Sequence, residues 1–145
     1  MSVYSGMDIS ASGMTAQRTR LDIISENIAN VNTTRDAQGN IYNRKSVIFQ
    51  EKGYATFDEL LLGTIGYSGQ GVKITNIFED TSTEGRMVYD PSHPDADENG
   101  YVTYPNVNTV QEMTDMIDAS RAYEANVTAF NASKNMQLKA LEIGK

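Results

Sequence analysis

Residues 107–143 read VNTVQEMTDMIDASRAYEANVTAFNASKNMQLKALEI, with no proline or glycine among them. Ala, Glu, Gln, Met, Lys and Leu are frequent in this stretch, and all of them favour helix. One helix over this range would be roughly 55 Å long at 1.5 Å per residue. Pro105, Asn106, Asn108 and Thr109 mark its beginning, Thr109 and Glu112 have the spacing of a capping box, and Gly144 marks its end. The sequence therefore predicts a single long C-terminal helix.

Large apolar side chains recur along this helix in two neighbouring rows, one stepping by three and four residues and the other by seven. Together they cover an arc of roughly 160°, wider than the ~100° stripe of a helix that packs on one side only. Four polar residues, Ser120, Glu124, Asn131 and Lys134, lie inside the arc, and alanines occupy the opposite side. This pattern favours a helix with several partner helices and polar positions that fix register. The plainer alternative is the core of a three- or four-helix bundle. The main members of the two rows are Val110, Met113, Met116, Ile117, Tyr123, Val127, Phe130, Leu138 and Leu141.

A second amphipathic helix is predicted over residues 7–31. Gly13 weakens its first half by ~1 kcal/mol relative to alanine, so the pattern is firmest over 14–31. Three asparagines, Asn27, Asn30 and Asn32, crowd its end. Because the two helices lie at opposite ends of the chain, we expect them to pair with each other, with neighbouring copies, or with both. The spacing of three and four residues places on one seam Met7, Ser10, Met14, Gln17, Leu21, Ile24, Ile28 and Val31.

The middle of the chain has a different character. Glycine-containing turns separate short segments of strand-like composition, and 63–71 reads as a glycine-rich loop. The predicted fold class is α+β, mainly α, with a coiled-coil-like helical domain made by both termini and a small β middle region. The predicted division is 1–33, 34–106 and 107–145. The candidate strands are Ile41–Gln50, Val72–Glu79, Arg86–Tyr89 and Tyr101–Tyr104, with a short helix or buried edge possible at Leu60-Leu61-Leu62.

Composition excludes several classes of function. A net charge of −7 argues against nucleic acid or anionic membrane as the main partner. No apolar run approaches the ~18 residues of a membrane span, and the N-terminus lacks the layout of a cleaved signal peptide. With no cysteine and one histidine, His93, the chain cannot supply thiol catalysis, a thiolate metal site or a site built on several histidines. We predict no catalytic, cofactor-binding or metal-binding residue, no small-molecule substrate, and no enzyme activity.

One acidic turn remains as a candidate metal site. Residues 95–100 read DADENG, which matches the first positions of an EF-hand calcium loop. Position 12 of that loop should be a bidentate glutamate, and here it is Asn106. The alternative is an acidic turn into the strand at 101–104, with Asn99-Gly100 as the bend.

Three stretches resemble bacterial flagellar rod and hook proteins. The N-terminal signature is similar to ISASGM at 9–14 and LDIISENIANVNT at 21–33, and the C-terminal signature to MIDASRAYEAN at 116–126 and LEIGK at 141–145. Residues 89–102, YDPSHPDADENGYV, and 104–108, YPNVN, are similar to a narrower group, the proximal rod subunits.

This resemblance implies a structural subunit of the flagellar basal-body rod. Such subunits are exported by the flagellar export apparatus without a cleaved signal. In the periplasm they assemble with copies of themselves and other rod subunits into a helical tube that transmits torque and surrounds the export channel. Two alternatives from the residues stay open, a closed coiled-coil adaptor and a calcium-binding module. The side chains expected to pack between subunits are Met14, Leu21, Ile24, Asn27, Ile28, Val31, Val110, Met113, Met116, Ile117, Tyr123, Glu124, Val127, Phe130, Asn131, Leu138 and Leu141.

Overall fold

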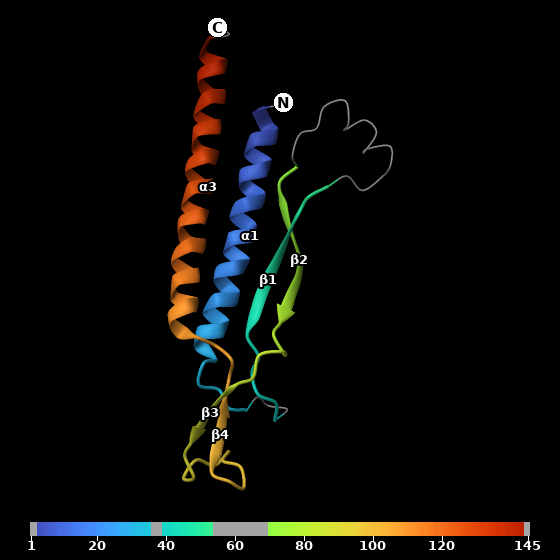
Figure 1. Cartoon of the computed structure of the whole chain (residues 1–145). Helices are drawn as coiled ribbons and strands as arrows, with labels where there is room; N and C mark the ends of the chain where they lie inside the picture. Colours follow the sequence, from blue (N-terminus) through green and yellow to red (C-terminus); the bar gives the residue numbers. More distant parts are fainter. Residues whose placement is uncertain (1–2, 36–38, 54–69, 144–145) are drawn as a thin grey trace. The chain divides into compact units, whose positions relative to one another are not determined.

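The computed structural model describes residues 3–35, 39–53 and 70–143, in which two long helices flank short strands along the chain (Figure 1). This confirms the predicted α+β class, mainly α, with a small β middle region. The described elements, in chain order, are α1 (Val3–Ala29), β1 (Lys45–Glu51), β2 (Val72–Glu79), β3 (Arg86–Tyr89), β4 (Tyr101–Tyr104) and α3 (Thr109–Ile143).

Helix α1 differs from its predicted range at both ends. It begins at Val3 rather than residue 7, and it ends at Ala29 rather than residue 31. Asn30 closes it, because its Nδ2 donates to the carbonyl of Glu26 at 2.9 Å and its own carbonyl accepts from the Thr33 amide at 3.0 Å. The residues that follow α1 therefore form a turn held by asparagine hydrogen bonds.

Helix α3 is capped by Asn108, one of the residues at its predicted start, rather than by Thr109. Asn108 Oδ1 accepts from the amides of Val110 (3.0 Å) and Gln111 (3.3 Å), so Asn108 is the N-cap and the helix starts at Thr109. The predicted capping box between Thr109 and Glu112 is wrong, because the Glu112 carboxylate bonds to Asn27 and Arg44 instead. Because Asn108 already caps the helix, and asparagine is as strong a cap as threonine, the Glu112 side chain is not needed for capping.

The chain divides into two compact units. One unit comprises Met1–Thr19, Ile48–Asn76 and Ala119–Lys145, and the other comprises Arg20–Val47 and Ile77–Asp118. Each unit therefore contains a part of α1 and a part of α3. The predicted division into 1–33, 34–106 and 107–145 stays a prediction.

In the first unit, α1 packs antiparallel on α3 through small and polar side chains. A Cβ at Gly6 would lie 3.8 Å from Ser133 Oγ, and a Cβ at Gly13 would lie 2.6 Å from Asn126 Oδ1. Ala16 is 3% exposed and Ala119 is fully buried. Small residues at these positions let the two helix backbones approach closely, so Gly13 is retained in mid-helix despite its low propensity.

Strands β1 and β2 form one antiparallel hairpin. The Asp80 amide donates to the Arg44 carbonyl at 2.9 Å, and the Lys52 amide donates to the Gly71 carbonyl at 2.8 Å. Strand β1 begins at Lys45, later than the predicted Ile41, because the segment before it bonds to the helices rather than to a strand. The predictions for residues 60–62 lie outside the described residues, as does most of the loop at 63–71.

Strands β3 and β4 form a second antiparallel hairpin, and both have their predicted bounds. Arg86 lies opposite Tyr104 and Tyr89 opposite Tyr101, with the two tyrosine rings in an edge-on contact at 5.2 Å. Gly100 has a φ of 81° just before β4, where the predicted Asn99-Gly100 bend turns the chain. The acidic segment 95–100 is thus part of a hairpin loop.

Candidate functional site

The apolar row of α3 lies largely on the surface of the chain. We call the side chains Val110, Met113 and Ile117 the apolar stripe, and their exposed fractions range from 52% at Ile117 to 75% at Val110. In the other unit, Leu138 and Leu141 are 50% and 71% exposed. Monomeric proteins rarely leave so many large apolar side chains of one helix in water, and where they do, the surface usually binds a partner. The stripe is therefore the candidate interaction surface.

The other predicted packing residues of α3 divide between exposed and half-buried positions. Tyr123, Glu124 and Asn131 are exposed, whereas Met116, Val127 and Phe130 are half-buried. On α1 and its end, Met14, Leu21, Ile28 and Val31 are half-buried. These residues keep some surface for a neighbour.

Two predicted packing residues face the interior instead. Ile24 is 5% exposed and Asn27 is fully buried. The hydrogen bonds of the Asn27 side chain are made within this chain. That Asn27 packs between subunits stays a prediction.

Asn27 is the centre of a buried polar cluster, which we define as Asn27, Tyr42, Arg44, Lys45 and Glu112. Its Nδ2 donates to the Lys45 carbonyl (2.8 Å) and to Glu112 Oε2 (3.0 Å). Its Oδ1 accepts from the Lys45 amide (2.9 Å) and from Tyr42 Oη (2.9 Å). An asparagine amide has two donor hydrogens and two acceptor positions, so all four are used. The amide thus joins α1 to the start of β1 and to α3.

Glu112 is, with Asn27, the other fully buried residue of the polar cluster. Its carboxylate is fully buried, and Arg44 Nε donates to Oε1 at 2.6 Å while Asn27 occupies Oε2. Arg44 also reaches Asp115 at 3.5 Å, and Arg20 of α1 approaches the other oxygen of Asp115 at 3.3 Å. A buried carboxylate is tolerated only when a positive charge and hydrogen bonds compensate for lost water, and both are present here.

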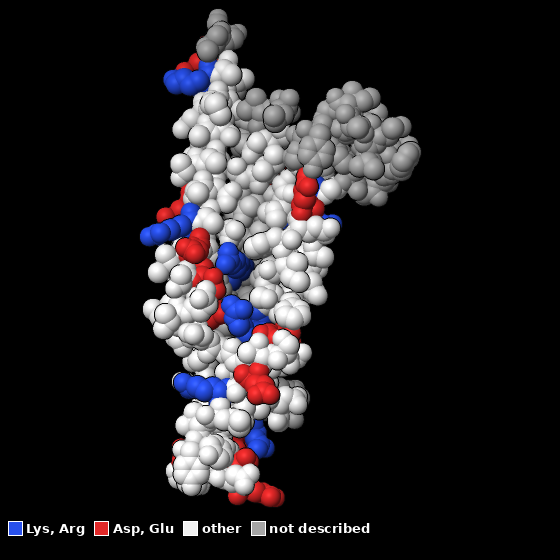
Figure 2. Space-filling view, in the orientation of Figure 1, with Lys and Arg blue, Asp and Glu red and all other residues white. Residues whose placement is uncertain are grey.

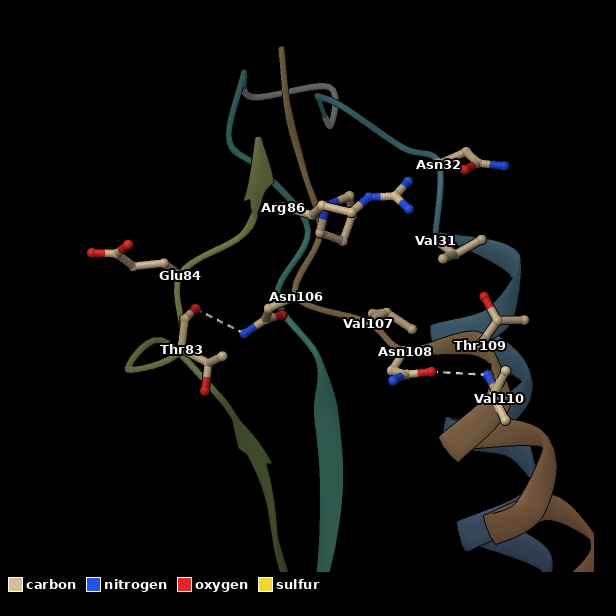
Figure 3. A pocket seen from close by; sticks show the side chains of 11 residues that line it. Val31, Asn32, Thr83, Glu84, Arg86, Asn106, Val107, Asn108, Thr109 and Val110 are labelled. Carbon is tan, nitrogen blue, oxygen red and sulfur yellow. Dashed lines mark hydrogen bonds between the residues drawn. The ribbon is translucent and has the colours of Figure 1, made fainter. Parts of the chain in front are cut away.

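The backbone of Arg44 is held as firmly as its side chain. Its amide donates to Asn106 Oδ1 at 2.8 Å, and Asn106 Nδ2 donates to the carbonyls of Asp80 (2.8 Å) and Thr83 (3.2 Å). Figure 3 shows Asn106 bonded to Thr83, and Asn108 capping α3 at Val110. Asn106 therefore ties the segment before α3 to both hairpins.

Burial and nearby negative charge both raise the pKa of the Tyr42 phenol. Desolvation raises its pKa well above the ordinary value of a tyrosine, and the negative charges of Glu26 and Glu112 raise it further. Lys45 Nζ pairs with Glu26 at 2.6 Å and lies 5.4 Å from the centre of the Tyr42 ring. The phenol consequently stays neutral and remains a donor to Asn27.

Sequence reasoning missed Tyr42, Arg44 and Asn106 and gave Glu112 a different task. Tyr42 and Arg44 lie in a segment of strand-like composition. Such composition does not predict that their side chains bond to Asn27 and Glu112 of the helices. Asn27, Asn30 and Asn32 form a group in the sequence, and their spacing alone does not separate the buried Asn27 from the half-buried Asn30 and the exposed Asn32.

The acidic loop is occupied by protein donors. Asp95 accepts from the Thr34 hydroxyl at 2.6 Å and pairs with Arg35 at 3.1 Å. Asp97 Oδ1 accepts from the amides of Asn99 (2.9 Å) and Tyr101 (2.8 Å). Within residues 3–35, 39–53 and 70–143, no group of three or more His, Cys, Asp or Glu side chains is placed to hold a metal ion.

An open groove of about 770 Å³ lies beside Asn106, where the end of α1 and the start of α3 face the β2–β3 connection (Figure 3). Its lining includes Val31, Val107 and Val110 together with Glu84 and Arg86. The lining side chains do not form a nucleophile–base pair, so the groove has no recognisable catalytic arrangement. On the face shown in Figure 2, acidic and basic side chains are interspersed rather than gathered by sign.

Comparisons with known proteins agree with the resemblance at both ends of the chain. A family model described as "Flagella basal body rod protein" matches residues 7–35, and one described as "Flagellar basal body rod FlgEFG protein C-terminal" matches residues 98–143. None of the described helices is long and apolar enough to cross a membrane.

Curated relatives match along the full length. The flagellar basal-body rod protein FlgC of Bacillus subtilis is 47% identical, with all of both chains covered. The FlgC of Borreliella burgdorferi is 46% identical over 99% of this chain and 98% of its own. The FlgC of Salmonella typhimurium is 36% identical, again with both chains fully covered.

Proposed function

Because this chain belongs to the FlgC family of flagellar basal-body rod proteins, and is thus a structural subunit of the flagellar basal-body rod, we propose that it joins the rod through the apolar stripe of α3. The observation that carries this proposal is the exposure of Val110, Met113 and Ile117 on a helix that is already paired with α1. Fully burying one such side chain stabilises an interface by ~1.5–3 kcal/mol.

The occupant of the stripe is a second copy of this chain or another rod subunit. The model matched by residues 98–143 is named for other rod proteins, FlgE, FlgF and FlgG, which supports a helix of common design in neighbouring subunits. An interface between unlike surfaces that does not close by rotation grows into an open helical assembly. This favours a tube around the export channel over the closed adaptor of the sequence alternatives.

Finer features of the function are part of the same proposal. The chain is exported by the flagellar export apparatus without a cleaved signal, assembles in the periplasm in the proximal part of the rod, and transmits torque there. It acts by packing rather than by catalysis, and its net charge of −7 is consistent with protein partners rather than nucleic acid.

Two exposed methionines of α3 give a matched test. Met113 lies in the stripe and is 56% exposed, whereas Met136 is 61% exposed and lies about 140° away around the helix at 100° per residue. We expect Met113→Ser to leave the stability of the isolated chain within ~0.5 kcal/mol, because the side chain is already in water. In cells, this variant should be exported but build few rods, whereas Met136→Ser should build them normally.

Basal bodies counted by electron microscopy, with chain levels measured in parallel, give the readout. Equal numbers of rods for the two variants at equal chain level would refute packing through the stripe. Fewer rods with Met136→Ser than with Met113→Ser would place the interface on the other side of α3.

A further inference from the structure

The loop between β3 and β4 carries the one Asn-Gly dipeptide of the sequence, Asn99-Gly100 (Figure 1). In such a dipeptide the backbone nitrogen of the glycine can attack the side-chain carbonyl carbon of the asparagine, because glycine has no side chain to hinder the approach. Asn99 is exposed, so water reaches its amide. The loop therefore contains a candidate site of covalent modification, at a residue outside the apolar stripe.

The reaction would convert the side-chain amide of Asn99 into a carboxylate. Base removes the proton of the Gly100 amide, and a bond forms between that nitrogen and Cγ of Asn99. The bond from Cγ to the side-chain nitrogen breaks, and this nitrogen leaves as ammonia after taking a proton from water. The resulting succinimide ring takes up one water molecule and opens at either carbonyl, which gives aspartate or isoaspartate. The reaction needs no co-reactant other than water.

Asp97 holds the backbone on both sides of the reacting residues. It accepts from three successive amides, since its Oδ1 accepts from Asn99 (2.9 Å) and Tyr101 (2.8 Å) and its carbonyl accepts from Gly100 (3.0 Å). Its own amide donates to the carbonyl of Tyr101 at 2.9 Å. The attack requires the Gly100 amide to lose its proton and its nitrogen to move onto the Asn99 side chain. Both steps break the bond from this amide to Asp97.

The hairpin also requires a glycine at position 100. Gly100 is buried, its φ is 81°, and its carbonyl accepts from the Asp90 amide at 2.9 Å. A Cβ at this position would lie 3.0 Å from the Tyr89 ring and 3.2 Å from Pro91. A larger residue, which would hinder the attack on Asn99, therefore does not fit here. The turn needs the residue that favours the reaction, so the restraint has to come from the surrounding hydrogen bonds.

We propose that Asn99 is a deamidation site of this chain and that Asp97 restrains the reaction by holding the Gly100 amide in the closed turn. The reaction then proceeds only from molecules in which this turn has opened, so its rate reports how often the turn opens. The proposal concerns the β3–β4 loop alone and does not depend on the function of the apolar stripe.

Modification would alter the hairpin itself. Isoaspartate adds one methylene group to the backbone within the turn, and either product adds a negative charge beside Asp97. The longer backbone would shift Tyr101, which lies opposite Tyr89 in the register of β3 and β4. The restraint by Asp97 therefore also preserves the pairing of these two strands.

Peptide mapping by mass spectrometry measures the reaction directly. The purified full chain is incubated at mildly alkaline pH, and the peptide with intact Asn99 is separated from its aspartate and isoaspartate forms. The same chain unfolded in guanidinium chloride gives the unrestrained rate. We expect the folded chain to react at least about tenfold more slowly, because each hydrogen bond broken on opening lowers the open population by about two- to tenfold.

Three variants identify the residue that restrains the turn, and each folded rate is divided by the rate of the same variant when unfolded. Asp97→Ala removes the acceptor of two amides and should raise this ratio by about fivefold or more. Asp97→Asn keeps an oxygen that can accept from both amides and should stay within about twofold of the unchanged chain. Asp90→Ala removes a carboxylate of the same loop that accepts from Ser92, and it should also stay within about twofold.

Slow reaction of the folded chain, with acceleration by Asp97→Ala alone, supports the proposal. A folded rate within about threefold of the unfolded rate would overturn it, because the turn would then offer no restraint. Equal acceleration by Asp90→Ala would show that losing any carboxylate loosens the loop, and equal acceleration by Asp97→Asn would show that the accepting oxygen is not the cause. Either result would overturn the role of Asp97. The assay counts no rods, so its failure is distinct from a failure of the proposed function.

Discussion

Replacing Asn27 by alanine should be one of the most damaging single changes to the stability of this chain. The substitution removes four hydrogen bonds of 2.8–3.0 Å at a site with no exposed surface. It leaves without partner the amide and carbonyl of Lys45, the hydroxyl of Tyr42 and one oxygen of Glu112. Each such loss costs ~1 kcal/mol when water can replace the partner and up to ~3 kcal/mol when it cannot.

The surroundings of the four hydrogen bonds place the cost of each loss near the lower end of that range. Tyr42 and Lys45 are half-buried, so water can reach them after a small shift, and Glu112 keeps its bond to Arg44. We therefore expect Asn27→Ala to lower the free energy of unfolding by ~3–5 kcal/mol, a large part of the ~5–15 kcal/mol of a typical domain. Asn27→Asp keeps the size but turns a carboxylate oxygen toward Glu112 and the Lys45 carbonyl, so we expect a loss at least as large.

Urea unfolding of the purified full chain, followed by far-ultraviolet circular dichroism, measures this quantity. Asn30→Ala is the matched control at the same helix end. Asn30 is half-buried, donates to the Glu26 carbonyl and accepts from Thr33, and its loss should cost only ~0.5–1 kcal/mol. A cost of Asn27→Ala within ~1 kcal/mol of the Asn30→Ala cost would refute the reasoning that the four bonds are made together in a buried site.

Further outcomes follow from other contacts. The raised pKa of Tyr42 means that its stabilising effect is complete below the unfolded tyrosine pKa of about 10 and is lost as pH rises toward the folded value. Alkaline unfolding curves of Tyr42→Phe should lack this part of the decline, and identical curves for both chains would contradict it. Gly13→Ala should destabilise the chain although alanine favours helix, because the added Cβ would lie 2.6 Å from Asn126 Oδ1, and Asn126→Ala in the same chain should restore stability in thermal melts. Calcium in large excess should leave the melting temperature unchanged, since Asp95 and Asp97 already accept from protein donors; a saturable rise abolished by Asp95→Ala would favour the calcium-binding module instead.

Local patterns explain why much of the fold could be predicted. Strands β2, β3 and β4 have their predicted bounds, because β-branched and aromatic runs between glycine turns specify strands through neighbouring residues alone. The long helix was evident from the lack of proline and glycine over 107–143. Its first residue was misplaced because Asn108 and Thr109 are both good caps, and spacing could not rank them.

The relation between the two helices could not be predicted in the same way. Hydrophobic periodicity locates the apolar stripe, but it does not say whether the stripe meets α1 or a partner outside the chain. The packing of the two helices also involves Arg44 and Lys45, which lie well before α3 in a segment that resembles a strand. Sequence periodicity therefore locates the apolar row of α3, whereas the buried hydrogen bonds that join α3 to α1 depend on residues that lie far apart in the sequence.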